Sequence, residues 1–159
     1  MSGELSLRHR QRTRALDGRL LRRMAEHLLT EHFHQKHFEL GIHLVADREM
    51  AQVNETFLQH RGSTDVITFS HAEPDQTNLL HGEIFICLDA AVRQARQFRT
   101  TWQSELVRYL IHGILHLEGF DDLAPAARRE MKKEENRLLK AVSKQFPLQR
   151  LEKKSKVKT

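Results

Sequence analysis

Apolar residues recur every three or four positions along much of the chain, a spacing that predicts amphipathic helices. The predicted helices cover residues 16–33, 47–60, 89–98, 101–118 and 125–146. Asp47 and Asp89 begin two of them, and we expect each carboxylate to cap the free N–H groups of its own helix. Pro125 suits the first turn of the last helix, where its fixed backbone angle and missing N–H are tolerated.

Apolar and polar residues alternate in four shorter segments, and this pattern predicts strands. The predicted strands cover residues 5–9, 38–46, 65–70 and 82–88. A polar loop flanked by His71 and His81 joins the third strand to the fourth, and either histidine could face a cleft or lie in solvent. Together the segments predict a single α+β domain, with about four strands in one sheet and about five helices packed with it.

Composition narrows the class of protein. At 159 residues, with 39% hydrophobic and 30% charged residues, the chain suits one soluble globular domain. Cys87 is its single cysteine, which excludes a disulfide framework and a thiolate zinc cluster. No run approaches the roughly 20 apolar residues that span a bilayer, and the basic N-terminus lacks a signal-peptide core. We expect a cytoplasmic protein without a membrane partner.

Positive charge is concentrated at both ends of the chain. Residues 1–23 hold seven arginines against Glu4 and Asp17, and the last ten residues hold five Lys or Arg against Glu152. Basic segments suit a polyanionic partner, although a solvated helix face and a solubilising tail would have the same composition. We expect the folded domain at residues 1–149 and a disordered basic tail at 150–159.

The stretch HGILHLEGFDD, residues 112–122, carries the candidate chemistry. His112 and His116 stand four residues apart and therefore lie on one face of a helix. Gly119 can adopt the left-handed conformation that ends a helix, and the turn would bring Asp122 back toward both imidazoles. Two imidazoles and one carboxylate are a common zinc-binding set that leaves a fourth position for water. The stretch predicts one zinc ion per chain, bound at a helix end.

The residue after the first histidine restricts the reaction that such a metal could support. Helical zinc peptidases carry HExxH, in which the glutamate acts as general base, whereas this chain has Gly113. A glycine inside a helix costs about 1 kcal/mol relative to alanine, so it indicates close approach by another group or tight helix packing. Peptidase chemistry would lack its base.

HGILHLEGFDD closely resembles the signature of the YbeY endoribonuclease family, His-Gly-x-Leu-His-Leu-x-Gly-aromatic-Asp-His. Two upstream segments continue the resemblance in the expected order. NETFLQHRGSTDVITF is similar to the family segment that ends Thr-Asp-Val-Leu-Ser-Phe, and HGEIFICLDAAVRQA is similar to its Gly-Asp-Ile strand and following helix. Together these segments cover about residues 50–125, and such a run is far more specific than a single motif.

The resemblance implies a zinc-containing α+β fold and single-strand-specific RNA cleavage. It also implies work on ribosomal RNA maturation, at the 3′ end of the small-subunit rRNA, and on ribosome quality control. The implied partners are single-stranded rRNA and the small ribosomal subunit or its assembly factors. Three rival readings remain: a zinc peptidase, an assembly factor that binds RNA without cutting it, and a structural metal closed by a fourth ligand such as His71 or His81.

The resemblance also assigns roles to individual residues. His112 and His116 match the first two metal ligands, and Asp122 stands where the family has its third, a histidine. Asp121 matches an aspartate of the family, as a partner of the ligands or as the third ligand itself. Leu58 replaces an arginine thought to contact RNA, and Arg61 could act in its place or be an ordinary surface residue.

Overall fold

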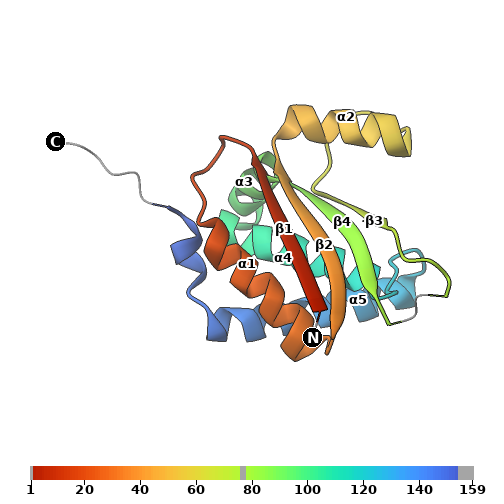
Figure 1. Cartoon of the computed structure of the whole chain (residues 1–159). Helices are drawn as coiled ribbons and strands as arrows, with labels where there is room; N and C mark the ends of the chain where they lie inside the picture. The colour runs from red at the N-terminus through yellow and green to blue at the C-terminus, as the bar shows by residue number, and fades with distance from the viewer. Residues whose placement is uncertain (1, 76–77, 154–159) are drawn as a thin grey trace.

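The computed structural model describes residues 2–75 and 78–153, which form one α+β domain (Figure 1). The strands are β1 (Ser2–Arg10), β2 (His37–Val45), β3 (Val66–Ser70) and β4 (Leu80–Cys87). The helices are α1 (Gly18–His27), α2 (Asp47–Leu58), α3 (Leu88–Phe98), α4 (Trp102–Leu117) and α5 (Pro125–Gln145). A π-helical turn (Leu28–His32) extends α1, and a 3-10 turn (Leu148–Leu151) follows α5. The predicted fold class is confirmed.

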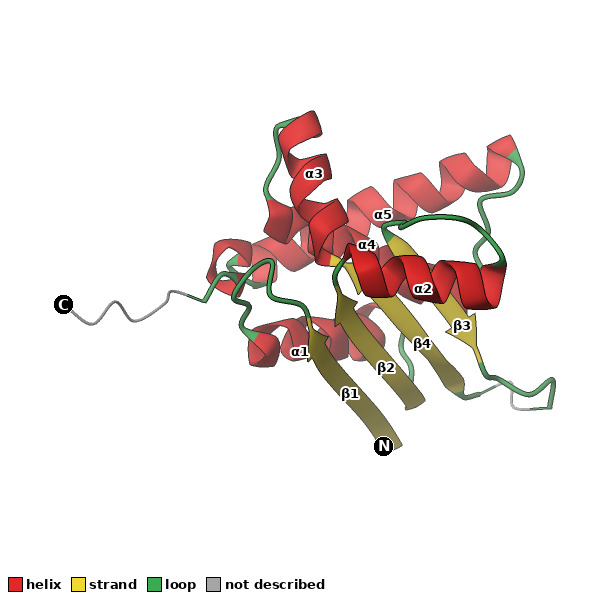
Figure 2. Ribbon diagram, turned by 90° about the horizontal axis from the view of Figure 1, so that it is seen from above, coloured by secondary structure: helices red, strands yellow, loops and turns green. Residues whose placement is uncertain are grey.

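The four strands form one mixed sheet in the order β1-β2-β4-β3. The first three of these are parallel, and β3 is antiparallel to β4 at one edge. Figures 1 and 2 show α1, α4 and α5 on one face of the sheet, with α2 on the other. Parallel strands need covered faces, and here the inner face is fully covered and the outer face only in part.

The inner face of the sheet packs against α4, which is buried over most of its length. Strand side chains alternate between the two faces, so Leu40, Ile42 and Leu44 of β2 and Ile84 and Ile86 of β4 point to the same core. This core fixes the position of α4 beside β4 and β3. The candidate histidines near the end of α4 are therefore held by a rigid layer.

On the outer face, α2 covers only the carboxyl ends of the strands. Met50 and Val53 of α2 pack there with Val45, Ile67 and Cys87 in a second, smaller cluster. Figure 1 shows no helix over the lower part of this face. Polar side chains of β1, β2 and β4 line a pocket there.

Two predicted helix caps are wrong, because the caps depend on contacts between helices. Ala46 occupies the N-cap position of α2, and the Asp47 carboxylate instead accepts from Arg93 at 2.6 and 3.0 Å. Cys87 occupies that position in α3. The Asp89 carboxylate accepts from the Asp47 backbone N–H at 2.7 Å, so a residue of α3 caps the start of α2.

The folded part of the chain extends beyond the predicted boundary at residue 150. Leu151 is fully buried, and the backbone N–H of Asp17 donates to its carbonyl oxygen at 2.8 Å. Glu152 forms a bridge with Leu16, and the Lys153 N–H donates to Ala15 at 3.0 Å. The buried Leu151 side chain and the backbone hydrogen bonds to residues 15 and 17 thus hold this segment to the domain. The rest of the predicted tail, 154–159, lies outside the described residues.

Among the helices that the structure describes, none combines the length and the apolar character needed to cross a membrane.

Candidate metal centre

The end of α4 presents both candidate histidines toward β3. Thr101 caps the start of α4 by accepting from the Ser104 N–H at 3.1 Å, and the helix ends at Leu117. Gly119 then adopts φ of +102°, a left-handed conformation that a side chain would strain. The chain turns back at this glycine, as predicted, and brings Asp122 to the imidazoles.

The three predicted ligands converge on one point. Nε2 of His112 lies 3.0 Å from Nε2 of His116, and Oδ2 of Asp122 lies 4.0 Å from the first nitrogen and 3.8 Å from the second. Ligands of a tetrahedral zinc ion, each 2.0–2.1 Å from the metal, are separated by about 3.3 Å. A small closure of the Asp122 side chain would complete this triangle, so the residues present fit a zinc ion.

The site is open to solvent on one side. The side chains of His112, His116 and Asp122 are 24%, 27% and 43% exposed. No fourth His, Cys, Asp or Glu among the described residues joins the group, and His71 and His81 line a different pocket. The fourth position is therefore accessible to water or to a substrate, as in a catalytic site rather than a closed structural one.

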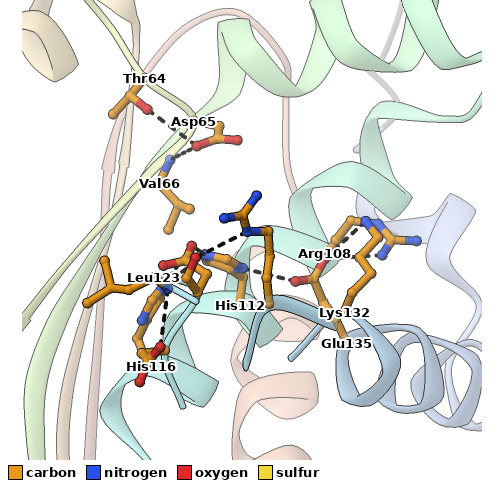
Figure 3. A network of polar contacts seen from close by, with 12 residues as sticks. Thr64, Asp65, Val66, Arg108, His112, His116, Leu123, Lys132 and Glu135 are labelled. Atoms are coloured by element: carbon orange, nitrogen blue, oxygen red, sulfur yellow. Dashed lines mark hydrogen bonds and ion pairs between the residues drawn. The ribbon is translucent and has the colours of Figure 1, made fainter. Parts of the chain in front are cut away.

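Glu135 of α5 orients the first histidine, as the chain of contacts in Figure 3 shows. Its Oε2 lies 2.9 Å from Nδ1 of His112, and its Oε1 accepts from Arg108 at 3.1 Å. With Nδ1 donating to this carboxylate, Nε2 keeps its lone pair for a metal. A buried carboxylate behind a ligating histidine also raises the basicity of the ring.

The surroundings of His116 and Glu135 shift the pKa of each side chain in the direction that favours metal binding. Burial lowers the pKa of His116, and the neighbouring His112 lowers it further, although Asp122 acts in the opposite direction. A neutral imidazole is the form that ligates a metal. Burial would raise the pKa of Glu135, but hydrogen bonds from His112 and Arg108 together outweigh it and leave that pKa below its usual range. Glu135 is thus ionised opposite His112.

A pocket of about 360 Å³ opens beside the histidines. Its walls include Asn54 and Leu58 of α2, His60, and Thr64, which precedes β3. Gln59 takes a left-handed conformation, with φ of +56°, and turns the chain so that the following residue enters the wall. The pocket combines hydrogen-bonding groups, an apolar patch and the candidate metal ligands.

Other predicted site residues lie elsewhere. The Asp121 carboxylate accepts from the Leu123 backbone N–H at 3.1 Å, which gives it a turn-forming role in the loop that carries Asp122. Arg61 is exposed in the turn after His60 and is not part of the pocket wall that the structure describes. Its proposed contact with RNA stays a prediction.

Gly113 is explained by helix packing. A Cβ atom built at this position would lie 2.8 Å from two carbons of the Ile84 side chain, closer than real Cβ atoms approach. The position faces β4 and the buried core. A glutamate there would not reach the candidate metal, so the peptidase arrangement is excluded by packing as well as by sequence.

Sequence reasoning missed Glu135 and the pocket residues Asn54, His60 and Thr64. Glu135 stands in the charged run KKEEN of α5, where the neighbouring Glu134 looks identical in sequence. The one available signal was helical phase: position 135 falls on the buried stripe of Met131, Leu138 and Val142. A glutamate on such a stripe requires a partner.

We expect Glu135→Gln to weaken zinc binding by about 10–100-fold, because it removes the charge behind His112 and keeps the shape of the side chain. Competition with a chromophoric chelator measures this affinity. The matched control is Glu134→Gln, which alters a surface pair with Arg137 and should leave the affinity unchanged. Equal affinities in both variants would contradict the orienting role.

Comparison with known proteins agrees with the geometry. The sequence profile of a family described as Endoribonuclease YbeY matches residues 6–143. A protein of Salinibacter ruber named Endoribonuclease YbeY is 32% identical over 146 residues, covering 87% of this chain and 91% of that protein. A relative of the same name from Parabacteroides distasonis is 38% identical over 111 residues, covering 70% of this chain and 76% of that protein.

A solved structure shares the fold over the whole length. It is the solution structure of a Thermotoga maritima protein, with a TM-score of 0.66 and 25% sequence identity. The match covers 98% of this chain and 99% of that one.

Proposed function

Since this chain belongs to the YbeY endoribonuclease family, we propose that it uses one zinc ion to cleave single-stranded ribosomal RNA. Its place of action would be the cytoplasm, on the 3′ end of small-subunit rRNA during maturation and in ribosome quality control. The small subunit or its assembly factors would present the substrate. The resemblance of residues 50–125 to the family motifs supports this assignment of substrate.

The convergence of His112, His116 and Asp122 beside an open pocket is the observation that carries the proposal. A bound zinc ion would supply a water of lowered pKa and would polarise a phosphoryl oxygen. The chain itself would hold the ion through these three side chains, with Glu135 fixing the ring of His112. Asp122 replaces the histidine of the family and brings one more negative charge to the metal.

The pocket wall would position the RNA strand. His60 and Thr64 offer polar groups that can bond phosphate or sugar oxygens, while Leu58 offers an apolar surface to a base. The Asn54 side chain donates to the Gly62 carbonyl at 2.9 Å and thereby holds the loop that carries His60. Arg61, exposed on the same loop, would contact a phosphate from outside the wall. These contacts would recognise the shape and the sugar-phosphate backbone of the RNA, which suits cleavage of a flexible single strand.

One experiment separates this function from its rivals. The protein is incubated with end-labelled RNA from the 3′ region of small-subunit rRNA, single-stranded or annealed to a complement, and separately with casein. We expect cleavage of the single strand, much slower cleavage of the duplex, and loss of activity after chelation that zinc restores. Cleavage of casein would identify a peptidase. Binding of the single strand without cleavage would identify an assembly factor and overturn the enzymatic proposal.

A further inference from the structure

A second group of histidines and carboxylates lies on the open part of the outer sheet face. Glu39 of β2 pairs in register with His81 of β4, and Glu83 lies two residues further along β4, on the same face. His71 follows β3 and donates its backbone N–H to the His81 carbonyl at 2.8 Å, which places the two histidines side by side. Strand register alone thus gathers two imidazoles and two carboxylates.

The side chains already interact in two pairs. Nε2 of His71 lies 2.7 Å from Oε2 of Glu83, and Nε2 of His81 lies 3.4 Å from Oε2 of Glu39. The two imidazole rings are 5.2 Å apart between centroids. The hydrogen bond from His71 lowers the pKa of Glu83, so this carboxylate is ionised. The His81–Glu39 separation is close to the distance of about 3.3 Å between two ligands of one zinc ion, whereas the His71–Glu83 separation is that of a hydrogen bond.

A buried histidine holds Glu83 from behind. His43 is only 7% exposed, stacks on Phe85 at 4.2 Å with nearly parallel rings, and bonds Oε1 of Glu83 through Nε2 at 2.9 Å. Its other ring nitrogen is buried and has no hydrogen-bond partner among the described residues. Leaving a buried polar atom unpaired costs desolvation free energy. The hydrogen bond through Nε2 is the contact that offsets this cost in part, and it fixes the orientation of the Glu83 carboxylate, as partners of metal ligands do.

The charge of the surrounding pocket suits a cation. The pocket has a volume of about 240 Å³ and is lined by Glu4, Glu39 and Glu83 together with both histidines, with no Lys or Arg in the described lining. Glu4 and Glu39 are directly opposite each other on β1 and β2, where two like charges repel. This is an acidic site on a protein with a formal net charge of +5.

We propose that His71, His81, Glu39 and Glu83 form a second binding site, for a divalent transition-metal ion of the zinc class. The ion would replace the His71–Glu83 hydrogen bond and the His81–Glu39 ion pair with four ligand bonds. Among the described residues, no three of these donor atoms lie within 4.8 Å of one another, so the half-exposed His81 and the exposed Glu39 side chains would rotate toward His71 and Glu83. Imidazole and carboxylate together select zinc, nickel or copper over magnesium or calcium. The site shares no residue with the catalytic pocket and would tie the β3–β4 connection to β2.

Because the side chains must rearrange, this site should bind more weakly than the candidate centre at α4 and should fill only when zinc is added. Its test uses His112→Ala/His116→Ala, which removes the first centre and makes the result independent of the proposed function. Calorimetric titration of this variant with zinc should give one ion per chain. Near-saturating zinc should raise its Tm by about 5 °C. Adding His71→Ala and His81→Ala should abolish both effects.

The matched control adds His9→Ala, an exposed histidine of β1, to the same background and should retain the second ion. Circular dichroism verifies that each variant is folded. Should the double variant fold poorly, titration of zinc-loaded wild type decides the question: it should take up one further ion per chain, and His71→Ala/His81→Ala should take up none. Uptake that is equal with and without His71 and His81 would overturn the proposal.

Discussion

Replacing His116 by alanine should remove one tightly bound zinc ion per chain and lower the rate of RNA cleavage by about 10³-fold or more. A metal that polarises a phosphoryl oxygen contributes several kcal/mol to transition-state stabilisation, and each 1.36 kcal/mol is tenfold in rate. His116 forms one corner of the ligand triangle, 3.0 Å from His112 and 3.8 Å from Asp122, so its removal would leave only two ligands. Elemental analysis and a single-turnover cleavage assay measure the two effects.

The same assays decide between the two aspartates. Asp122→Asn should lose metal and activity, because its carboxylate faces both histidines. Asp121→Asn should keep both, since its side chain serves the backbone of the turn. His9→Ala is the histidine control and should behave as wild type. Undiminished zinc in His116→Ala, or loss of zinc in Asp121→Asn but not in Asp122→Asn, would contradict the ligand assignment.

Gly113→Glu should unfold the protein or destabilise it by about 3–5 kcal/mol, the range for an uncompensated buried charge. The new side chain would enter the space of Ile84, which is fully buried between β4 and α4. Overpacking adds to the penalty. The substitution restores the HExxH pattern in sequence, yet no peptidase activity should appear. Urea unfolding monitored by circular dichroism measures the change in the free energy of unfolding.

Leu123→Glu provides the comparison for this prediction. Leu123 is 86% exposed in the loop after Asp122, so the same acidic side chain should change the free energy of unfolding by less than about 0.5 kcal/mol. If Gly113→Glu unfolds at the urea concentration of wild type, then the glycine is not required by packing. Its position in the signature would then need a different explanation.

Local patterns in the sequence were sufficient for the fold class and for the triangle of candidate metal ligands. A spacing of four residues on a helix and a glycine that ends it are geometric facts, so His112, His116 and Asp122 could be brought together without coordinates. The caps show where such reasoning stops. Asp89 caps α2 rather than α3 because the starts of the two helices meet in space, and nothing local to either segment reports that contact.

Local sequence patterns could not predict the roles of Glu135 or of the histidines and carboxylates on the outer sheet face, for the same reason. Glu135 approaches His112 across a helix pair, from 23 residues further along the chain. His71 and His81 flank a loop in sequence, but their partners depend on β2 lying between β1 and β4, an order that sequence periodicity does not specify. Spatial order of strands is set by tertiary packing. Side chains whose roles depend on it can be found only once that order is known.

The pairing of residues 15–17 with residues 151–153 brings basic side chains from both ends of the described chain together. Arg19, Arg22 and Lys153 line one pocket at that end, and Figure 1 shows the end of the described chain beside the start of α1, away from the start of α5. The acidic outer pocket and the three-ligand centre belong to other parts of the surface. In the field of a large polyanion, basic side chains gathered on one side of a molecule would turn that side toward the polyanion before contact. The orientation of the protein as it approaches such a polyanion would then depend partly on where residues 15–17 and 151–153 pair.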